Sequence, residues 1–347
     1  MLSSGTYQQI LNASKKERRQ YIELLNKKYD LDYRTAMGLT KLIISKKLTE
    51  EEAQKYMDKE YYTFSNVIEL AKDDMLHCLI PISFYENDEF LQETGITCIP
   101  SYFAFGCQTI HDFHINARIT EIGEKAFYSC GNLKVVTAQQ RKEKIVIGKK
   151  AFYDCIRLKE VLLHAPIEIG TETFLNCLSL HNIEADIITL ESGAFDGCVM
   201  ISAMYMPKLK IIGKRAFHDC IRLEDIKVPL VKKIDEYAFQ NCYSLEDVRF
   251  DNIEEINKGA FQSSGLVTLK LNGIEQIEET AFGDCEYLET LKIQSMAVSE
   301  VKENAFQGCT SLNTIMVNGN IYDTKNMSCY EILTNTLKNH ETRGEQA

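Results

Sequence analysis

The stretch IIGKRAFHDCIRLEDIKV, residues 211–228, contains a pattern that returns along most of the chain. Its Ala216-Phe217 pair is followed, three residues after Phe, by Cys220. Equivalent Phe residues stand at positions 127, 152, 174, 195, 217, 239, 261, 282 and 306, so successive copies are 21 to 25 residues apart. This period is typical of a solenoid, because one such unit cannot bury its apolar face without a neighbour. We therefore predict a stacked array of coils.

An alternating apolar run follows each cysteine. In residues 211–228 it consists of Leu223, Ile226 and Val228, and the same L-x-x-V-x-L spacing returns in other copies. Alternation of this kind, rich in β-branched residues, predicts a short strand with one buried face. We therefore expect a short strand in the coils of the array.

A second apolar position lies five residues before Phe, and it is commonly an Ile followed by Gly, as in Ile147-Gly148. Glycine at a fixed place indicates a turn, so we expect a positive φ there. A degenerate coil over residues 99–115 precedes the regular copies. Together the patterns predict about ten coils, which form a solenoid over residues 99–327.

The segment before the array has a different character. Residues 1–75 are expected to form a small helical bundle, since capping-box pairs such as Thr49 with Glu52 occur beside apolar positions at helical spacing. Residues 76–98 are interpreted as a capping segment. Within it, residues 79–84 are expected to form a strand that covers the apolar face of the first coil.

The segment after the array is short. Ser328 with Glu331 is a further capping-box pair, and it predicts the start of a helix. We interpret residues 328–347 as a C-terminal helix and a loose tail.

Most of the twelve cysteines fall in one column of the repeat. The column contains Cys107, Cys130, Cys155, Cys177, Cys198, Cys220, Cys242, Cys285 and Cys309, and Ser264 replaces Cys in one copy. Such a column is typical of small buried residues, because disulfides between neighbouring coils would leave other coils unpaired. We therefore expect reduced thiols, which fit a reducing compartment.

Charge and hydropathy narrow the possible classes of protein. The formal net charge is -11, which disfavours nonspecific nucleic-acid binding, yet residues 1–48 contain ten Lys and Arg against four Asp and Glu. Neither a signal peptide nor a stretch of eighteen apolar residues is recognised, so no membrane insertion is expected. The expected location is cytoplasmic; the alternative is the cell surface or secretion by a route without a classical signal peptide.

The combined Ile-Gly, Ala-Phe-x-x-Cys and L-x-x-V-x-L pattern resembles the BspA-like leucine-rich repeat proteins over roughly residues 96–320. The resemblance implies an α/β solenoid: a curved array with one short parallel strand per coil on its concave face, here preceded by a small helical bundle. Members of that family are typically surface or secreted binding proteins of host-associated microbes. Some of them bind extracellular-matrix components, and others are intracellular with unknown partners.

The strand columns of the repeat are the place where a solenoid usually binds. The column that directly follows the central apolar residue of each strand reads Tyr205, Lys227, Arg249, Lys270 and Lys292 in successive copies. We predict these five side chains as binding residues on the outward face. Asp225 and Asp247 are expected to neutralise Lys227 and Arg249, whereas Lys270 and Lys292 face only Thr. The alternative is an ordinary solvated sheet face.

No motif for nucleotide, metal or nucleophilic chemistry is recognised, so no cofactor, metal or catalytic residue is expected and the chain is not expected to be an enzyme. His111 and His114 stand three apart in a strand and therefore point to opposite faces. The first hypothesis is a noncatalytic scaffold that binds a protein ligand through the concave strand face. Two alternatives are a cell-surface adhesin for host or matrix proteins, and a nucleic-acid-associated protein that uses the basic helices, although a nucleic-acid partner is the least favoured.

Overall fold

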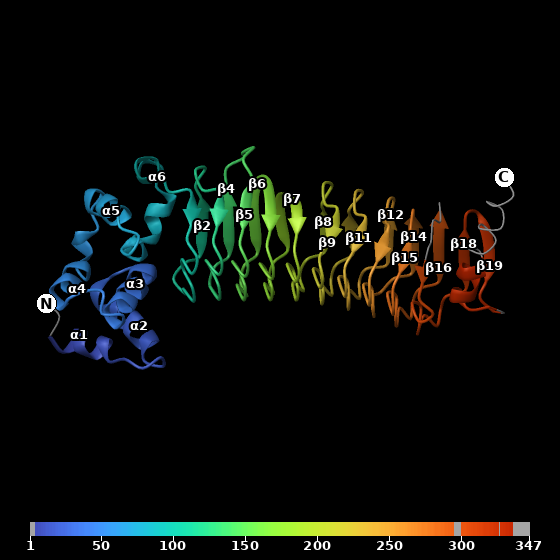
Figure 1. Cartoon of the computed structure of the whole chain (residues 1–347), viewed down its shortest axis with the longest axis horizontal. Coiled ribbons are helices and arrows are strands. Elements are labelled where there is room, and N and C mark those ends of the chain that lie inside the picture. The colour runs from blue at the N-terminus through green and yellow to red at the C-terminus, as the bar shows by residue number, and fades with distance from the viewer. Residues whose placement is uncertain (1–3, 295–299, 326, 336–347) are drawn as a thin grey trace.

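The computed structural model describes residues 4–294, 300–325 and 327–335. A group of helices lies at one end of a long array of coils, whose strands stand side by side (Figure 1). The array of about ten coils spans residues 98–317, which confirms the predicted solenoid and the helical region before it. The predicted tail lies outside the described residues.

Helices occupy the chain up to Thr94. The α-helices are α1 (Ser4–Leu11), α2 (Arg18–Tyr29), α3 (Tyr33–Ile44), α4 (Glu50–Tyr56), α5 (Phe64–Ala71) and α6 (Asp88–Thr94), with 3-10 helices η1 (Lys59–Tyr61), η2 (His77–Leu79) and η3 (Ile82–Glu86). The Thr49–Glu52 capping box begins α4, as its sequence predicts.

The strand expected over residues 79–84 is wrong, because η2 and η3 occupy this segment. The Arg34 side chain donates to the carbonyl oxygens of His77 and Ile80, at 2.9 and 3.0 Å. These two carbonyl groups therefore face a buried guanidinium. The segment still contacts the first coil, since the Tyr85 ring lies 4.7 Å from that of Phe103.

Two columns of parallel strands run along the array. The column after the cysteines contains β2 (Asp112–Ile115), β4 (Val135–Ala138), β6 (Glu160–Ile169), β7 (Asn182–Leu190), β8 (Ala203–Tyr205), β10 (Asp225–Lys227), β12 (Asp247–Phe250), β14 (Thr268–Asn272), β16 (Thr290–Gln294) and β18 (Thr314–Val317). We call its outward side the strand face. The other column contains β1 (Cys98–Ile99), β3 (Glu121–Ile122), β5 (Ile145–Ile147), β9 (Ile211–Ile212), β11 (Lys233–Ile234), β13 (Glu255–Ile256), β15 (Gln276–Ile277) and β17 (Glu300–Val301). The long strands β6 and β7 extend into this column as well, since residues 167–169 of β6 pair with β5 and with β7.

The second column corrects the expectation of one strand and a glycine turn per coil. Gly148 has no positive φ; instead, a Cβ at this residue would lie 2.9 Å from the Ile122 carbonyl oxygen of the preceding coil. Glycine is therefore suited to close approach between coils, which lets the short strands pair. Positive φ occurs two residues later, at Lys150, and again before the cysteine, at Asp154.

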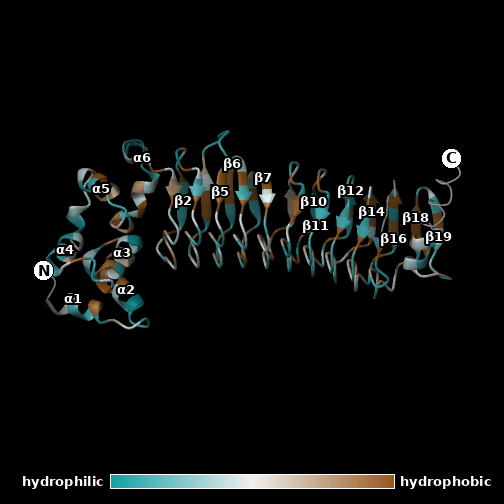
Figure 2. Ribbon diagram, in the orientation of Figure 1, coloured by the Kyte–Doolittle hydropathy of each residue, from teal (hydrophilic) through white to brown (hydrophobic). Residues whose placement is uncertain are grey.

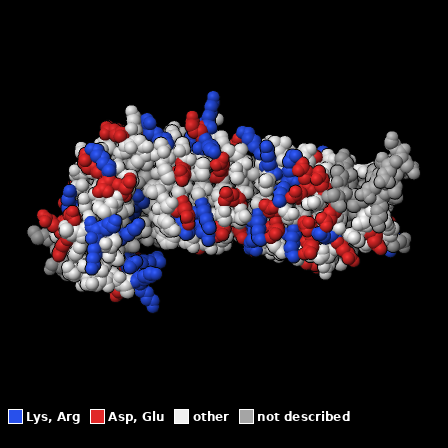
Figure 3. Space-filling view, in the orientation of Figure 1, with Lys and Arg blue, Asp and Glu red and all other residues white. Residues whose placement is uncertain are grey.

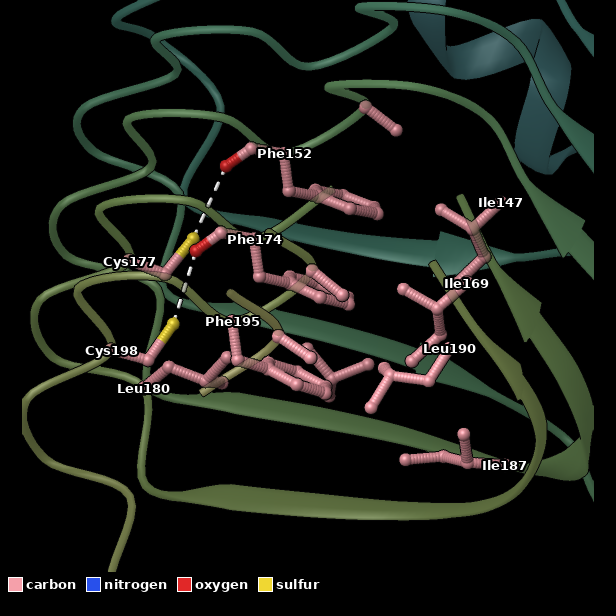
Figure 4. Close-up of a cluster of buried hydrophobic side chains, with 14 of the residues drawn as sticks. Ile147, Phe152, Ile169, Phe174, Cys177, Leu180, Ile187, Leu190, Phe195 and Cys198 are labelled. Carbon is pink, nitrogen blue, oxygen red and sulfur yellow. Dashed lines mark hydrogen bonds between the residues drawn. The ribbon is translucent and has the colours of Figure 1, made fainter. Parts of the chain in front are cut away.

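The phenylalanines form one continuous stack inside the array. From Phe127 to Phe306, neighbouring rings have centroids 5.0 to 5.5 Å apart and planes within 18° of each other. Figure 4 shows Phe152, Phe174 and Phe195 in this arrangement, facing the isoleucines of the second strand column. Hydrophobic residues recur in the strands along the whole array (Figure 2).

The cysteines join neighbouring coils by hydrogen bonds. Cys177 Sγ donates to the Phe152 carbonyl oxygen at 3.2 Å, and Cys198 Sγ donates to that of Phe174 at 3.0 Å (Figure 4). All twelve cysteines are free in this structure. Burial raises the pKa of the Cys198 thiol well above its ordinary value, so the donor form persists.

The far end of the array is closed by a hairpin and a helix. β18 pairs antiparallel with β19 (Asn320–Asp323) through Asn318 and Gly319, both of positive φ. This Asn-Gly turn is a strong hairpin signal that the interpretation of the repeat overlooked. A helix follows from residue 329, and Ser328 with Glu331 forms its capping box, as predicted.

Candidate functional site: the strand face

The five predicted binding residues lie on the outward side of the strand column, but in two separate sheets. Tyr205 of β8 pairs in register with Lys227 of β10. Arg249 of β12 pairs with Lys270 of β14, which in turn pairs with Lys292 of β16. Among the described residues, no ladder joins β10 to β12. Within each of the two sheets, the predicted residues are therefore neighbours in the order in which they occur in the sequence.

Proline accounts for the short ladder between β8 and β10. Pro207 and Pro229 follow the last residues of these strands by two positions. A proline has no N–H to donate, so it stops a ladder from continuing. β12, β14 and β16 have no proline there and are four or five residues long.

Two of the four cations in this column, Lys227 and Arg249, form ion pairs. Lys227 pairs with Asp225 at 3.1 Å, as predicted. Arg249 pairs with Asp251 at 2.6 Å, whereas the sequence pattern had assigned it Asp247. Asp251 directly follows β12, so a comparison of the strand columns alone does not include it.

The two remaining cations have no such partner. In the part of the chain that the structure describes, Lys270 and Lys292 form no ion pair. Lys270 is exposed and Lys292 is half-buried. Their strands lie about 4.8 Å apart, so two positive charges stand next to each other on the face.

Tyr205 borders a groove that sequence reasoning did not anticipate. The groove has a volume of about 760 Å³ and is lined by His164, Pro166, Asp186, Pro207 and Lys208, among others. Tyr205 is 66% exposed. A polar insertion over residues 141–144 joins β4 to β5, and its Arg141 and Lys142 supply part of the groove wall.

Arg141 in this insertion is anchored to the first coils. Its Nη1 donates to the carbonyl oxygens of Asn116 and Ala117, at 3.3 and 2.8 Å. Its Nε and Nη2 are buried without a hydrogen-bond partner, and this burial lowers the pKa of the Arg141 guanidinium. The residue thus holds the insertion against the array.

A buried polar cluster lies at the turns of two middle coils. His218 Nδ1 lies 2.9 Å from Asp196 Oδ1 and 3.1 Å from Asp219 Oδ2, so these three groups could surround a cation. The Arg215 guanidinium already contacts Asp196, with Nε 3.0 Å from Oδ2. Sequence reasoning missed this cluster because its members come from two coils and carry no metal-binding spacing.

The two histidines considered for a metal are engaged separately. His111 Nδ1 contacts the Thr109 carbonyl oxygen at 3.1 Å, and His114 Nδ1 contacts Thr137 Oγ1 at 3.0 Å. Elsewhere, acidic and basic side chains alternate along the visible face of the array (Figure 3). Every described helix is too short or too polar to cross a membrane.

Coils of this length, with stacked Phe and Cys inside and parallel strands outside, define a leucine-rich repeat solenoid. The family described as "BspA type Leucine rich repeat region" matches residues 84–202, 143–267 and 232–342. Together these matches cover most of the chain, which therefore belongs to that family, as the resemblance predicted.

Several solved structures are similar to this chain. A leucine-rich repeat protein from Bacteroides ovatus is 24% identical, with 63% of this chain and 69% of that chain covered and a TM-score of 0.40. A leucine rich cell surface protein from Faecalibacterium prausnitzii is 24% identical, with 65% and 84% covered and a TM-score of 0.32. The pneumococcal vaccine antigen PcpA is 17% identical, with 60% and 74% covered and a TM-score of 0.34. No curated protein matches the chain.

Proposed function

We propose that the chain is a noncatalytic binding module that docks an acidic surface of a partner protein on its strand face. The observation that carries the proposal is the pair Lys270 and Lys292, which lie in register on neighbouring strands without an ion pair among the described residues. Adjacent like charges repel, so a carboxylate from a partner would relieve a cost that the free protein bears.

The other predicted residues support the same face to different degrees. Arg249 extends the pair by one strand, although Asp251 already compensates its charge. Tyr205 offers a large exposed ring beside a groove, the kind of side chain that often anchors an interface. Lys227, paired with Asp225, is expected to contribute least.

Affinity capture with the full chain tests the proposal. The double variant Lys270→Glu/Lys292→Glu should lose its captured partner, and capture by the unmodified chain should weaken as salt is raised. The matched control is Lys149→Glu/Lys210→Glu, which makes the same charge change at exposed lysines outside the strand face. Identical partner sets for both double variants would refute a role of the strand face.

For the location, we propose the cytoplasm. The free thiols stacked along the array support this choice, because a reducing compartment keeps such cysteines unpaired. A cell-surface adhesin that uses the same face is the alternative. Labelling of intact cells with a reagent that cannot cross membranes separates the two: the cytoplasmic proposal fails if the protein is labelled before lysis.

A further inference from the structure

One coil of the array is shorter than its neighbours at its outer turn. Six positions separate Phe239 from Leu245, and six separate Phe282 from Leu288, but only five separate Phe261 from Leu266. The missing residue belongs to the turn after the cysteine column, where the coil has a single glycine, at position 265. The turn of this coil is thus one residue shorter than the equivalent turns of the two neighbouring coils.

Gly265 makes this short turn possible. A Cβ at Gly265 would lie 1.9 Å from the Tyr243 carbonyl oxygen, so only glycine fits against the preceding coil. The backbone is held there by a hydrogen bond from Gly265 N to the Cys242 carbonyl oxygen, at 3.1 Å. The shortened turn therefore has a defined path.

A cavity of about 720 Å³ lies at this turn. We call it the notch, and its principal lining residues are Tyr243, Glu246, Gly265, Asp284, Glu286 and Tyr287. Tyr243 comes from the preceding coil and Tyr287 from the following one, and their side chains are 59% and 66% exposed. Two tyrosine rings thus border a gap that a turn of ordinary length would occupy.

The charge of the notch has one sign. Its lining includes Glu246, Asp284 and Glu286 but neither Lys nor Arg. In the described part of the chain none of these three carboxylates forms an ion pair; Asp284 only accepts a hydrogen bond from the Gln262 side chain, at 3.3 Å.

Other carboxylates at the turns of the array do form ion pairs. Glu236 pairs with Lys214 at 2.6 Å and Glu279 pairs with Lys258 at 2.9 Å, in each case across neighbouring coils. The cations of the strand face lie farther along the strands: Arg249 is three residues beyond Glu246, or about 10 Å in an extended chain. The notch is therefore an acidic gap beside a basic face.

We infer that the notch binds a cationic side chain, Arg or Lys, of a partner polypeptide. A guanidinium or ammonium group gains from the face of a tyrosine ring and from charge-assisted hydrogen bonds to carboxylates, and the notch presents both kinds of group. Its volume lies within the range of about 300 to 1,000 Å³ that is usual for ligand pockets. This site is independent of the proposed strand-face function, because it selects the opposite charge.

Fluorescence polarisation with the full chain tests the inference, with a labelled nonapeptide of Gly and Ser that carries three Arg as the probe. The same peptide with citrulline in place of Arg serves as the neutral isostere. Binding of the Arg peptide should weaken about tenfold in Tyr243→Ala/Tyr287→Ala and in Glu246→Gln/Glu286→Gln, and the citrulline peptide should not bind. Far-UV circular dichroism checks that the variants are folded.

Controls separate the notch from general attraction to an acidic protein. Glu143→Gln/Glu224→Gln removes two exposed carboxylates elsewhere and should leave the affinity unchanged. Insertion of one Ser after Gly265 restores the ordinary turn length and should abolish binding. Equal losses in the control variant, or unchanged affinity in the two notch variants, would overturn the inference. So would calcium binding that depends on Glu246 and Glu286 while the Arg peptide does not bind.

Discussion

The helical region and the coils of the array are held together in different ways. Within the array, the same kinds of contact recur between most neighbouring coils: a ring stack, a thiol-to-carbonyl hydrogen bond and parallel strand ladders. The helical region meets the first coil through contacts that occur once. Arg34 is the clearest of them, because its Nη1 donates to the Phe103 carbonyl oxygen at 3.2 Å.

At the junction with the first coil, Arg34 adds a different contact to the cysteine hydrogen bond that recurs inside the array. There, the carbonyl oxygen of a stacked Phe accepts a hydrogen bond from the cysteine of the next coil. At the first coil, the Ala104 carbonyl oxygen accepts the equivalent bond from Cys130 Sγ at 3.0 Å. The Phe103 carbonyl oxygen accepts in addition from the buried Arg34 guanidinium, which also lies 4.8 Å from the Phe103 ring centroid. A repeat contact is therefore shared among many coils, whereas the junction depends on individual residues.

The largest effect is expected from breaking the ring stack in the middle of the array. Phe217 is fully buried, with ring centroids 5.5 Å from Phe195 and 5.4 Å from Phe239. Phe217→Ala should lower the free energy of unfolding by about 3 to 5 kcal/mol, through lost burial and the cavity that remains. Urea titration measures this loss. Ile221→Ala, at a 40% exposed side chain of the same coil, should cost much less; equal costs would contradict the role of the stack.

A somewhat smaller and local effect is expected at the junction. Arg34→Met would remove the side-chain donor from the carbonyl oxygens of Ile80 and Phe103, and it would leave that of His77 with the Ile80 N–H alone, at a cost of about 3 kcal/mol. Hydrogen exchange should accelerate in residues 77–107 and stay unchanged around Phe217. The control is Arg19→Met, at an exposed arginine of α2. Uniform acceleration along the array would show that the junction is not a separate unit.

The array could be predicted from the sequence because its contacts repeat. Ala-Phe-x-x-Cys returns at nearly constant spacing, and a constant spacing places equivalent residues in one column. The second strand column escaped prediction, since each of its strands is only two or three residues long outside β6 and β7. Such segments become strands only when the next coil supplies their hydrogen bonds.

Contacts that do not repeat could not be predicted in the same way. The buried position of Arg34 depends on how η2 and η3 fold over the first coil, and no local pattern encodes this. In the candidate site, the column from Tyr205 to Lys292 followed from the repeat, but the partner of Arg249 did not, because Asp251 lies outside the compared columns. The notch had a signal, the short spacing between Phe261 and Leu266, whose meaning required its neighbours.

The smallest predicted effect concerns the thiols of the repeat. Burial raises the pKa of the Cys220 thiol well above its ordinary value of 9.0, so the folded chain keeps this proton when the unfolded chain loses it. The unfolded state then binds fewer protons than the folded state, and stability falls as the pH rises above about 9. The contribution of one thiol approaches about 1.4 kcal/mol per pH unit.

Cys220→Ser measures this contribution, since serine does not titrate in this range and its hydroxyl can still donate to the Phe195 carbonyl oxygen, as Cys220 Sγ does at 3.2 Å. Urea titrations between pH 8 and 10.5 should show a shallower decline of stability for the variant than for the unmodified chain. The two proteins differ by this one titrating side chain, so the difference between their stabilities isolates one thiol. An equal decline of stability with pH in both proteins would contradict this prediction. It would mean that the Cys220 thiol titrates in the folded chain as it does in the unfolded one.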